Sequence, residues 1–479
     1  MGRKKTSILL IFIITLAVIA TTILWRGEHI LNALNPLKIK NIDLIHLPEN
    51  RLRLKLKVTT NRKCKTFIKY WAKNSRDTLY TGISEGTKEH TLWVTNALAN
   101  TNYTFKVVAF NSSQTAFSRN HPLETQPIYQ ATPYFSLEYM NKKFSKEMKG
   151  KFFLTQILTE PGSAVIIDHK GNIVWYEAFK KGVKVSHWTP DRTVLCIVGS
   201  EKIPSSGGDE IVELDLSGKV LTHLQRGKGE MDKMVHHEVR TDENGNIYAL
   251  TFEKKVFDLS AAGGAKRDTV HGDGIVVFSR KGKKIWQWSV LDHLNPLDDK
   301  EILKHKKDWV HANSVFKEKD GNFLISYRDL NQIWKIDYKT GRVIWKLGEK
   351  GNFQLNKDDL FSSQHFAHIN RKGELMILDN GSKKQITRAM AFKVDTITHT
   401  AVTTLNVPLL KDYYTSAKGN AELFNGDKIL FCVTDPRALL ITDKKGRVLW
   451  KVQVGGDPYR IEEIANFLSY NPISNVQGH

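Results

Sequence analysis

The chain has 479 residues, of which 41% are hydrophobic and 10% aromatic, so it is not a disordered protein and is too long for one ordinary domain. Its 71 lysines and arginines exceed its 50 aspartates and glutamates, which gives a formal net charge of +21. This balance favours anionic partners such as membrane head groups or small sulfated or phosphorylated molecules. The sequence has no RNA-recognition, zinc-finger or helix-turn-helix pattern, so no nucleic-acid partner is expected.

The first 28 residues predict a signal anchor. Arg3, Lys4 and Lys5 precede an uncharged, mostly apolar run, Ser7–Leu24, which as a helix would span ~27 Å, close to a bilayer core. The run lacks a clean A-x-A-like cleavage site, so an uncleaved anchor is favoured over a cleaved signal peptide. The basic start should stay in the cytoplasm. The rest of the chain is then expected to be periplasmic or otherwise extracytoplasmic, held to the inner membrane by the N-terminal helix.

The cysteines do not form a disulfide framework, because Cys64, Cys196 and Cys432 are odd in number and far apart. Cys196 and Cys432 lie in apolar, strand-like runs, which predicts buried thiols. The sequence contains no CxxC or HExxH signature, and no metal site is predicted from spacing.

Residues 36–126 carry short alternating runs without helical periodicity, which predicts a β-sandwich domain. One of these runs, residues 92–111, resembles the fibronectin type III (Ig-like) pattern, in which Leu98 and Tyr103 would form the corner before the sixth strand. The region has no cluster of catalytic residue types, so a spacer or packing role is expected.

Residues 134–465 contain one strand–turn–strand unit six times, which predicts an all-β, six-bladed propeller that closes near Val454. The units are centred on Gly171, Gly218, Gly282, Gly341, His399 and Gly446, and successive centres lie 47–64 residues apart. A β-helix would have much shorter coils. Four tryptophans occupy matching places in these units and are expected to pack between blades: Trp175, Trp286, Trp345 and Trp450.

The segments between these units should be the inner strands of the blades. His237, Asn313 and His365 each stand eight residues before the glycine of a turn. Because inner strands line the central channel, these three side chains should converge at one end of it. His311 points to the same side, since side chains alternate along a strand. Arg328 should return to the same rim on the neighbouring strand.

Other histidines are expected to have lesser roles. His236 should point away from His237 unless an irregular strand start exchanges them, and His187 is a contribution from the first blade. Both are further candidates for substrate binding. His368 and His399 are interpreted as structural residues.

The residue types at this site favour an oxyanion over a metal. Three histidines could bind Zn²⁺ or Cu²⁺, but a cationic arginine in the same ring would repel a metal and suits an anion. Glu238 is the one carboxylate expected on the inner strands, which argues against glycoside hydrolysis.

Several runs occur in the order found in the bacterial aryl-sulfate sulfotransferases, which this chain resembles over about Gly162–Gln453. These runs are VHAN, SYRDLNQIWKID, the QH pair and ILDNG. The resemblance implies an exported six-bladed propeller with an N-terminal sandwich. It also implies that a channel histidine attacks the sulfur of an aryl sulfate, becomes a sulfohistidine and is discharged by a phenol.

The resemblance assigns roles to residues of this chain. The nucleophile matches His365, the HxN pair matches His311 and Asn313, and the sulfate-holding arginine matches Arg328. The remaining histidine falls on the HH pair, where His237 is preferred over His236. Known members carry a disulfide near the site, which the cysteines of this chain cannot form.

The implied activity is PAPS-independent, ping-pong transfer of a sulfuryl group from a phenolic sulfate ester to a phenol, without a cofactor. Neutral imidazole is a competent nucleophile near pH 7, because its pKa is ~6.5. The alternative is a non-catalytic propeller that binds anionic ligands or partners on its basic funnel. A quinone-dependent dehydrogenase propeller would need eight blades. The partners expected are small aryl sulfates and phenols, and a homodimer stays open.

Overall fold

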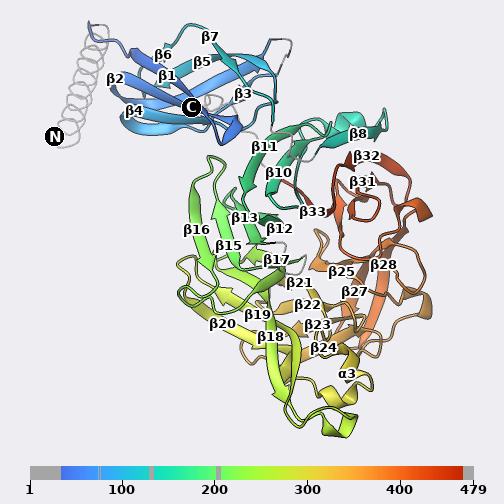
Figure 1. The fold of residues 1–479 in the computed structure, drawn as a ribbon. Helices are drawn as coiled ribbons and strands as arrows, with labels where there is room; N and C mark the ends of the chain where they lie inside the picture. Colours follow the sequence, from blue (N-terminus) through green and yellow to red (C-terminus); the bar gives the residue numbers. More distant parts are fainter. Residues whose placement is uncertain are drawn as a thin grey trace, which may run out of the picture. The chain divides into compact units, whose positions relative to one another are not determined.

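The computed structural model describes residues 34–73, 75, 77–128, 134–200, 206–465 and 467. It divides the chain into two compact units, one of Met1–Pro127 with Leu468–His479 and one of Ile128–Phe467. Both are built almost wholly of antiparallel strands (Figure 1). The anchor expected at residues 1–28 lies outside the described residues. Within the described ranges, no helix is long and apolar enough to cross a membrane.

The first unit is a seven-stranded arrangement organised around one long strand. Its strands are β1 (Ile39–Leu47), β2 (Asn50–Ala72), β3 (Leu79–Tyr80), β4 (Ser84–Val94), β5 (Asn102–Phe110), β6 (Thr115–Phe117) and β7 (His121–Glu124). The first half of β2 pairs with β1 and β4, and its second half pairs with β5. The hydroxyl of Tyr103 accepts a hydrogen bond from the Leu98 backbone N–H at 2.8 Å, which is the corner contact that the sequence suggested.

The second unit is a six-bladed β-propeller, as the repeats predicted. Each blade is an antiparallel sheet of four or five strands (Figure 1). From the channel outward, blade 1 holds β33 (Pro458–Glu463), β9 (Phe152–Ile157), β10 (Gly162–Asp168) and β11 (Ile173–Phe179). Blade 2 holds β12 (Gly182–Trp188), β13 (Val194–Gly199), β15 (Glu210–Leu214) and β16 (Val220–Gln225). Blade 3 holds β17 (Val235–Thr241) with β14 (Gly207–Gly208) on its free edge, then β18 (Ile247–Phe257), β19 (Asp268–Phe278) and β20 (Lys284–Ser289).

The remaining blades follow the same order. Blade 4 holds β21 (Ala312–Lys317), β22 (Phe323–Tyr327), β23 (Gln332–Ile336) and β24 (Val343–Gly348). Blade 5 holds β25 (His365–Ile369), β26 (Leu375–Asp379), β27 (Arg388–Asp395) and β28 (Thr400–Pro408). Blade 6 holds β29 (Asn420–Phe424), β30 (Lys428–Val433), β31 (Ala438–Thr442), β32 (Val448–Val454) and β8 (Phe135–Met140).

Both ends of the propeller sequence close the ring. Near its C-terminal end, β33 supplies the innermost strand of blade 1, and near its N-terminal end, β8 supplies the outermost strand of blade 6. The expected closure near Val454 is confirmed in blade 6, where Val454 pairs with Phe135 of β8, whereas the second closure, by β33 in blade 1, was not expected. β33 could not be predicted from the sequence, because it pairs with β9, which is remote in the chain, and so it is not part of a hairpin.

Tryptophan indoles join the blades at their outer edges. Trp175, Trp288 and Trp450 each donate a hydrogen bond to a carbonyl in the outer turn of the next blade. The acceptors are the carbonyl oxygens of Leu216, Gly341 and His169, at 2.9, 2.7 and 2.8 Å respectively. Packing between blades is thus confirmed for Trp175 and Trp450. Packing between blades is also confirmed for Trp286, which stacks on Phe323 of blade 4 with ring centroids 5.3 Å apart, although in blade 3 the hydrogen bond to the next blade comes from Trp288.

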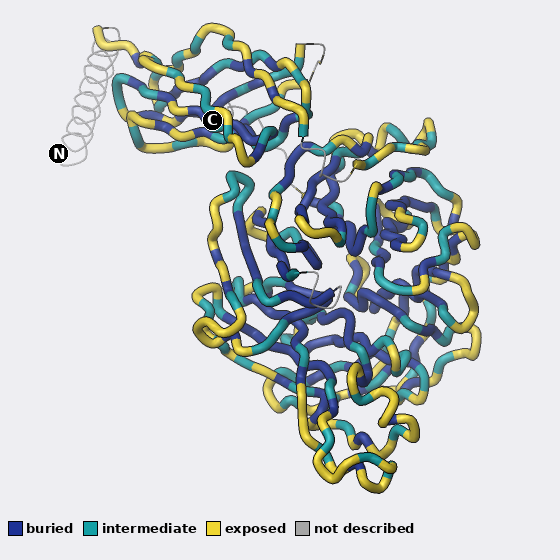
Figure 2. Tube along the Cα trace, viewed as in Figure 1, coloured by how far each residue is buried: buried dark blue, intermediate teal, exposed yellow. Residues whose placement is uncertain are grey.

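The inner strands are buried but irregular. Figure 2 shows that most of the inner-strand backbone is buried, while the loops are exposed. Register shifts interrupt the pairing of β12, β17, β21, β25 and β33. His237 and Phe366 lie in two of these shifts with φ of 54° and 57°. Bulges re-aim side chains and are common beside active sites, so the channel side chains depart from simple alternation.

Candidate active site

The orientation of the His365 ring is set by its hydrogen bonds. Its Nδ1 lies 2.7 Å from Asn380 Oδ1, and the residue is 1% exposed. The Asn380 amide donates to the carbonyl oxygens of Thr415 and Lys418, each at 3.1 Å, so its oxygen must face the imidazole. Nδ1 of His365 therefore carries the proton, and Nε2 keeps its lone pair.

A backbone amide faces this lone pair. Lys418 N–H donates to His365 Nε2 at 3.2 Å. Lys418 and Gly419 both have left-handed backbone, with φ of 63° and 83°, and a Cβ on Gly419 would lie 2.3 Å from the Cys432 carbonyl oxygen. Glycine is needed at this position because any side chain would collide with the backbone. The tight turn before β29 thus places a hydrogen-bond donor beside His365 Nε2.

His365 is held neutral. Burial lowers the pKa of its imidazole well below the usual value, and the positive charges of Arg460, His311 and Arg328 lower it further. The Asn380 hydrogen bond opposes this shift but does not reverse it. A buried imidazole that stays unprotonated at neutral pH has the electronic state that a nucleophile requires.

His237 and His311 lie close enough to His365 to interact with it electrostatically, and His236 contacts His237. We call these four residues together the histidine cluster. His237 Nδ1 lies 2.7 Å from His236 Nδ1, and the rings of His237 and His311 are 5.1 Å apart. His236 Nε2 lies 3.2 Å from Asp273 Oδ1. The expectation that His236 points away from His237 is wrong, because the bulge at φ 54° brings both rings together. Burial, followed by its histidine neighbours, lowers the pKa of His237 well below the usual value.

His311 has the opposite electrostatic setting. Its Nδ1 lies 2.7 Å from Asp308 Oδ2. Burial alone would lower the pKa of His311, but the hydrogen bond and charge of Asp308, with Asp273 and Asp329, outweigh burial and raise it. The cluster therefore contains one histidine that favours the protonated form beside two that favour the neutral form. Such a separation of pKa values is typical of an acid beside a nucleophile.

Asn313 and Arg328 lie where the hairpin was expected to bring them. Ala312 pairs with Tyr327, and Arg328 N–H donates to the His311 carbonyl at 3.0 Å, so both residues stand at one end of blade 4. Asn313 Nδ2 donates to the Gln364 carbonyl at 2.7 Å, which ties blade 4 to blade 5. Arg328 Nη1 donates to Asp329 at 2.8 Å.

Arg460 is a central residue that the sequence analysis missed. It lies on β33, is 2% exposed, and its Nη2 donates to the Asn313 carbonyl of blade 4 at 3.2 Å. Its Nη1 donates to the carbonyl oxygens of Gly419 and Tyr459. The guanidinium thus links blades 1, 4 and 6 across the channel. The sequence indicated it only indirectly: six blades need six inner strands, and the inner strand that carries Arg460 had to follow the last outer hairpin.

The site contains several buried polar atoms without a protein partner. Within the described ranges they are Asn313 Oδ1, Tyr327 Oη, Arg328 Nε, Gln364 Oε1, Tyr459 Oη and Arg460 Nε. Buried polar atoms are normally satisfied, so the lack of partners for these atoms favours a polar ligand at the site. Two of the donors belong to guanidinium groups, which favours an anion.

A second polar group, the glutamate cluster, consists of Glu238, Glu422 and Glu462 on β17, β29 and β33. Arg240 contacts Glu238 and Glu462 at 3.2 and 3.3 Å, and His187 Nδ1 contacts Glu462 at 2.8 Å. Glu238 was expected to be the one carboxylate on the inner strands. This expectation is wrong, because Glu422 and Glu462 also lie on inner strands. His187 lies on β12, in blade 2 and not the first blade. It contacts the glutamate cluster, and no described hydrogen bond joins it to the histidine cluster.

Phe366 contacts two arginines, Arg460 and Arg240. The guanidinium carbons of Arg460 and Arg240 each lie 5.1 Å from its ring centroid. His368 bonds to the Phe366 carbonyl at 3.0 Å, and burial lowers the pKa of His368 to about 4. His368 is influenced by the charges of Arg240 and Glu462, and no described hydrogen bond joins it to Asn380 or His365.

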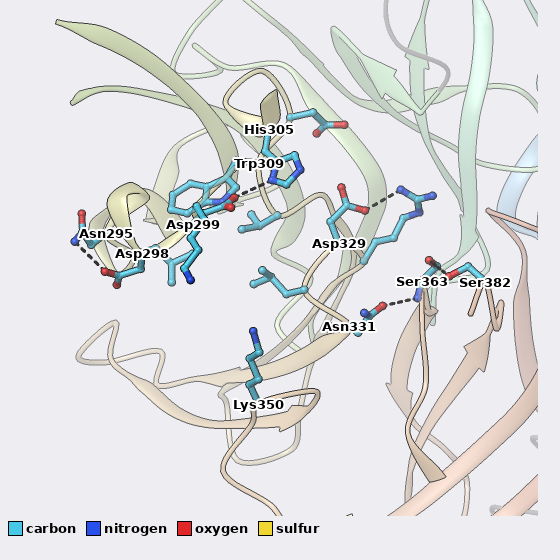
Figure 3. A pocket seen from close by; sticks show the side chains of 16 residues that line it. Asn295, Asp298, Asp299, His305, Trp309, Asp329, Asn331, Lys350, Ser363 and Ser382 are labelled. Carbon is cyan, nitrogen blue, oxygen red and sulfur yellow. Dashed lines mark hydrogen bonds and ion pairs between the residues drawn. The ribbon is translucent and has the colours of Figure 1, made fainter. Parts of the chain in front are cut away.

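A cavity of about 770 Å³ opens beside Arg328 (Figure 3). It is bounded by the insertion between β20 and β21, which contains η2 (Val290–Asp292), η3 (Pro296–Asp298) and α3 (Ile302–His305), and by loops of blades 4 and 5. Asp308, the partner of His311, and Ser363, two residues before His365, also line it. The cavity therefore adjoins the histidine cluster. Throughout the described ranges, the site included, no group of three or more histidines, cysteines or acids is arranged to hold a metal ion.

A sequence model of the family described as Arylsulfotransferase (ASST) matches residues 138–437. The chain belongs to the arylsulfotransferase family. The match includes every member of the histidine cluster together with Asn313 and Arg328, and it supports a sulfotransferase enzyme. Arg460 lies beyond the matched residues.

The solved structures that resemble this chain are distant in sequence. A Bacteroides caccae protein of unknown function is 11% identical, with a TM-score of 0.44 over 66% of this chain and 99% of that chain. Virginiamycin B lyase from Staphylococcus aureus is 10% identical, with a TM-score of 0.33 over 67% of this chain and 99% of that chain. These scores carry no argument about function. No curated protein matches the chain.

Proposed function

We propose that this arylsulfotransferase family member moves a sulfuryl group from an aryl sulfate to a phenol in two displacements at His365 Nε2, independently of PAPS. The observation that carries the proposal is a neutral, buried imidazole whose lone pair is assigned to Nε2, beside two guanidinium groups with unpartnered Nε atoms. A sulfate ester is an anion, which those guanidinium groups would attract.

In the first displacement, His365 Nε2 forms a bond to sulfur as the bond from sulfur to the aryl oxygen breaks. Arg328, Arg460 and the Lys418 amide would receive the sulfonate oxygens as their charge shifts. His311, whose pKa is raised, would give its proton to the departing phenoxide. The products are a phenol and sulfohistidine.

In the second displacement, an acceptor phenol attacks the same sulfur. His311, now neutral, would take the phenol proton as the bond between nitrogen and sulfur breaks. His365 leaves as a neutral imidazole and returns to its first state. Asn380 suits this reversibility because it is an uncharged partner and does not neutralise the positive charge of the sulfated ring, which keeps the ring a good leaving group.

The location of the protein remains an inference from its N-terminal sequence. We infer that the apolar run at Ser7–Leu24 anchors it in the inner membrane and that the propeller works in the periplasm. Small aryl sulfates and phenols would reach it there. Protease added to intact spheroplasts should digest the propeller. Full protection of the propeller would show that it faces the cytoplasm.

The test of the chemistry is brief exposure of the protein to a chromogenic aryl sulfate without an acceptor. Peptide mapping should find a sulfuryl group on the peptide that contains His365, and added phenol should remove it. His365→Ala should abolish labelling, while His368→Ala, a variant of its neighbour on β25, should retain it. Sulfate binding without phenol release would favour a non-catalytic anion-binding propeller. Transfer without a covalent label would refute the two-displacement mechanism.

A further inference from the structure

The cavity beside Arg328 has an apolar part that suits an aromatic ring. Leu294, Trp309, Val310 and Leu330 line it, and its volume of about 770 Å³ is typical of small-molecule sites. Because the cavity adjoins Arg328 and the partner of His311, a phenol lodged in it can direct its oxygen toward the sulfur held at His365. This step rests on the proposed function.

The lining of the cavity holds four carboxylates and three fixed cations, Lys300, Arg328 and Lys350, but these groups are not evenly paired. Most of its acids already have partners, since Asp299 contacts His305, Asp308 contacts His311 and Asp329 contacts Arg328, at 2.8, 2.7 and 2.8 Å. Asp298 accepts a hydrogen bond from Asn295 Nδ2 at 3.1 Å.

Two lysines of the cavity have no such partner. Lys300 and Lys350 also line it, and neither forms an ion pair with any residue in the described ranges. Figure 3 shows the Lys350 side chain extending into the cavity, across from Asp299 and Trp309. Lys350 follows β24 with φ of 56°, so its backbone leaves the strand direction at this point.

We propose that this cavity selects phenols that carry an anionic substituent, such as a carboxylate, which pairs with Lys350 and Lys300. An ammonium next to an apolar wall is a common arrangement for an aromatic acid, since the ring packs on the wall and the carboxylate meets the charge. A cationic phenol would meet two unpaired lysines and would be disfavoured. The substrate class of the acceptor is therefore a phenolic acid.

The experiment compares three acceptors on one frame: 3-(4-hydroxyphenyl)propionate, its primary amide and 3-(4-hydroxyphenyl)propylamine. With a fixed aryl sulfate donor at low ionic strength, the kcat/KM should be about threefold to tenfold higher for the carboxylate than for the amide, and lowest for the amine. Lys350→Gln should reduce this preference, and Lys300→Gln with Lys350→Gln should abolish it. Lys339→Gln, an exposed lysine in the β23–β24 turn, is the matched control and should leave the preference unchanged.

The outcomes separate this proposal from the proposed function. If none of the three phenols is sulfated, the proposed function itself fails. If all are sulfated but the carboxylate is no better than the amide, or if the amine is best, the charge selection is refuted while sulfuryl transfer stands. A preference that survives loss of both lysines also refutes it.

Discussion

Arg460 offers the sharpest test of the site, because it is buried and central, and all its described hydrogen bonds go to backbone carbonyls. Its guanidinium donates to three backbone carbonyls, and within the described ranges it forms no ion pair. Arg460→Met keeps a side chain of similar length but removes the charge and all five N–H donors. If Arg460 holds the sulfuryl group, activity and anion binding should be lost while the fold survives.

The expected magnitudes can be estimated for stability and for catalysis. Burying an unpaired cation costs several kcal/mol, whereas each hydrogen bond to a charged group contributes roughly 1.5–3 kcal/mol. These terms nearly cancel, so without an anion the unfolding free energy of Arg460→Met should differ from wild type by less than about 2 kcal/mol. Loss of a preorganised donor to a developing oxyanion typically lowers kcat by about 10²–10³-fold.

The assay combines thermal unfolding with kinetics. Inorganic sulfate at about 100 times its Kd should stabilise the wild type by about 2.7 kcal/mol, which raises the Tm by roughly 5 °C. Arg460→Met should show no sulfate-dependent rise and a kcat/KM for an aryl sulfate lower by about 10²-fold. A variant with an unchanged sulfate response and unchanged kinetics would remove Arg460 from the site.

Three other substitutions test separate parts of the structure. Asp308→Asn removes the charge that raises the pKa of His311, so His311 should lose its proton at a lower pH than in the wild type. In a pH profile of kcat/KM for the donor, activity should therefore begin to fall at a lower pH, and an unchanged profile would contradict the acid role of His311. Arg328→Lys keeps the charge but loses the planar fork, and turnover should fall about tenfold to a hundredfold with an unchanged Tm. Trp175→Phe deletes the hydrogen bond to Leu216, so unfolding should become about 1 kcal/mol easier with kinetics intact; a kinetic change would mean that blade packing controls the site.

Local patterns in the sequence were sufficient for the architecture. The outer hairpins around Gly171 and Gly341 are contiguous, and their alternation and turn residues are legible without any remote partner. The shared eight-residue offset placed His237, Asn313 and His365 on inner strands, because an inner hairpin is also local. The propeller and most of the candidate site could therefore be predicted before the fold was known.

Contacts between remote strands decided the rest. Arg460 could not be predicted because β33 pairs with β9 at the far end of the propeller sequence, so its register is set by ring closure. The tautomer of His365 depends on Asn380 and on carbonyls at Thr415 and Lys418, which belong to a different connection. Simple alternation failed at His236 and His237 because a bulge with left-handed backbone rotates the strand.

Periodicity reports which face of a strand a residue occupies when the strand is regular, and that information is local. Hydrogen bonding, burial and charge at the channel axis arise from six strands that meet only when the ring closes. The sequence by itself determined the propeller and the candidate nucleophile. The tertiary structure alone decided the protonation states around that nucleophile and the buried arginine across the channel from Asn313.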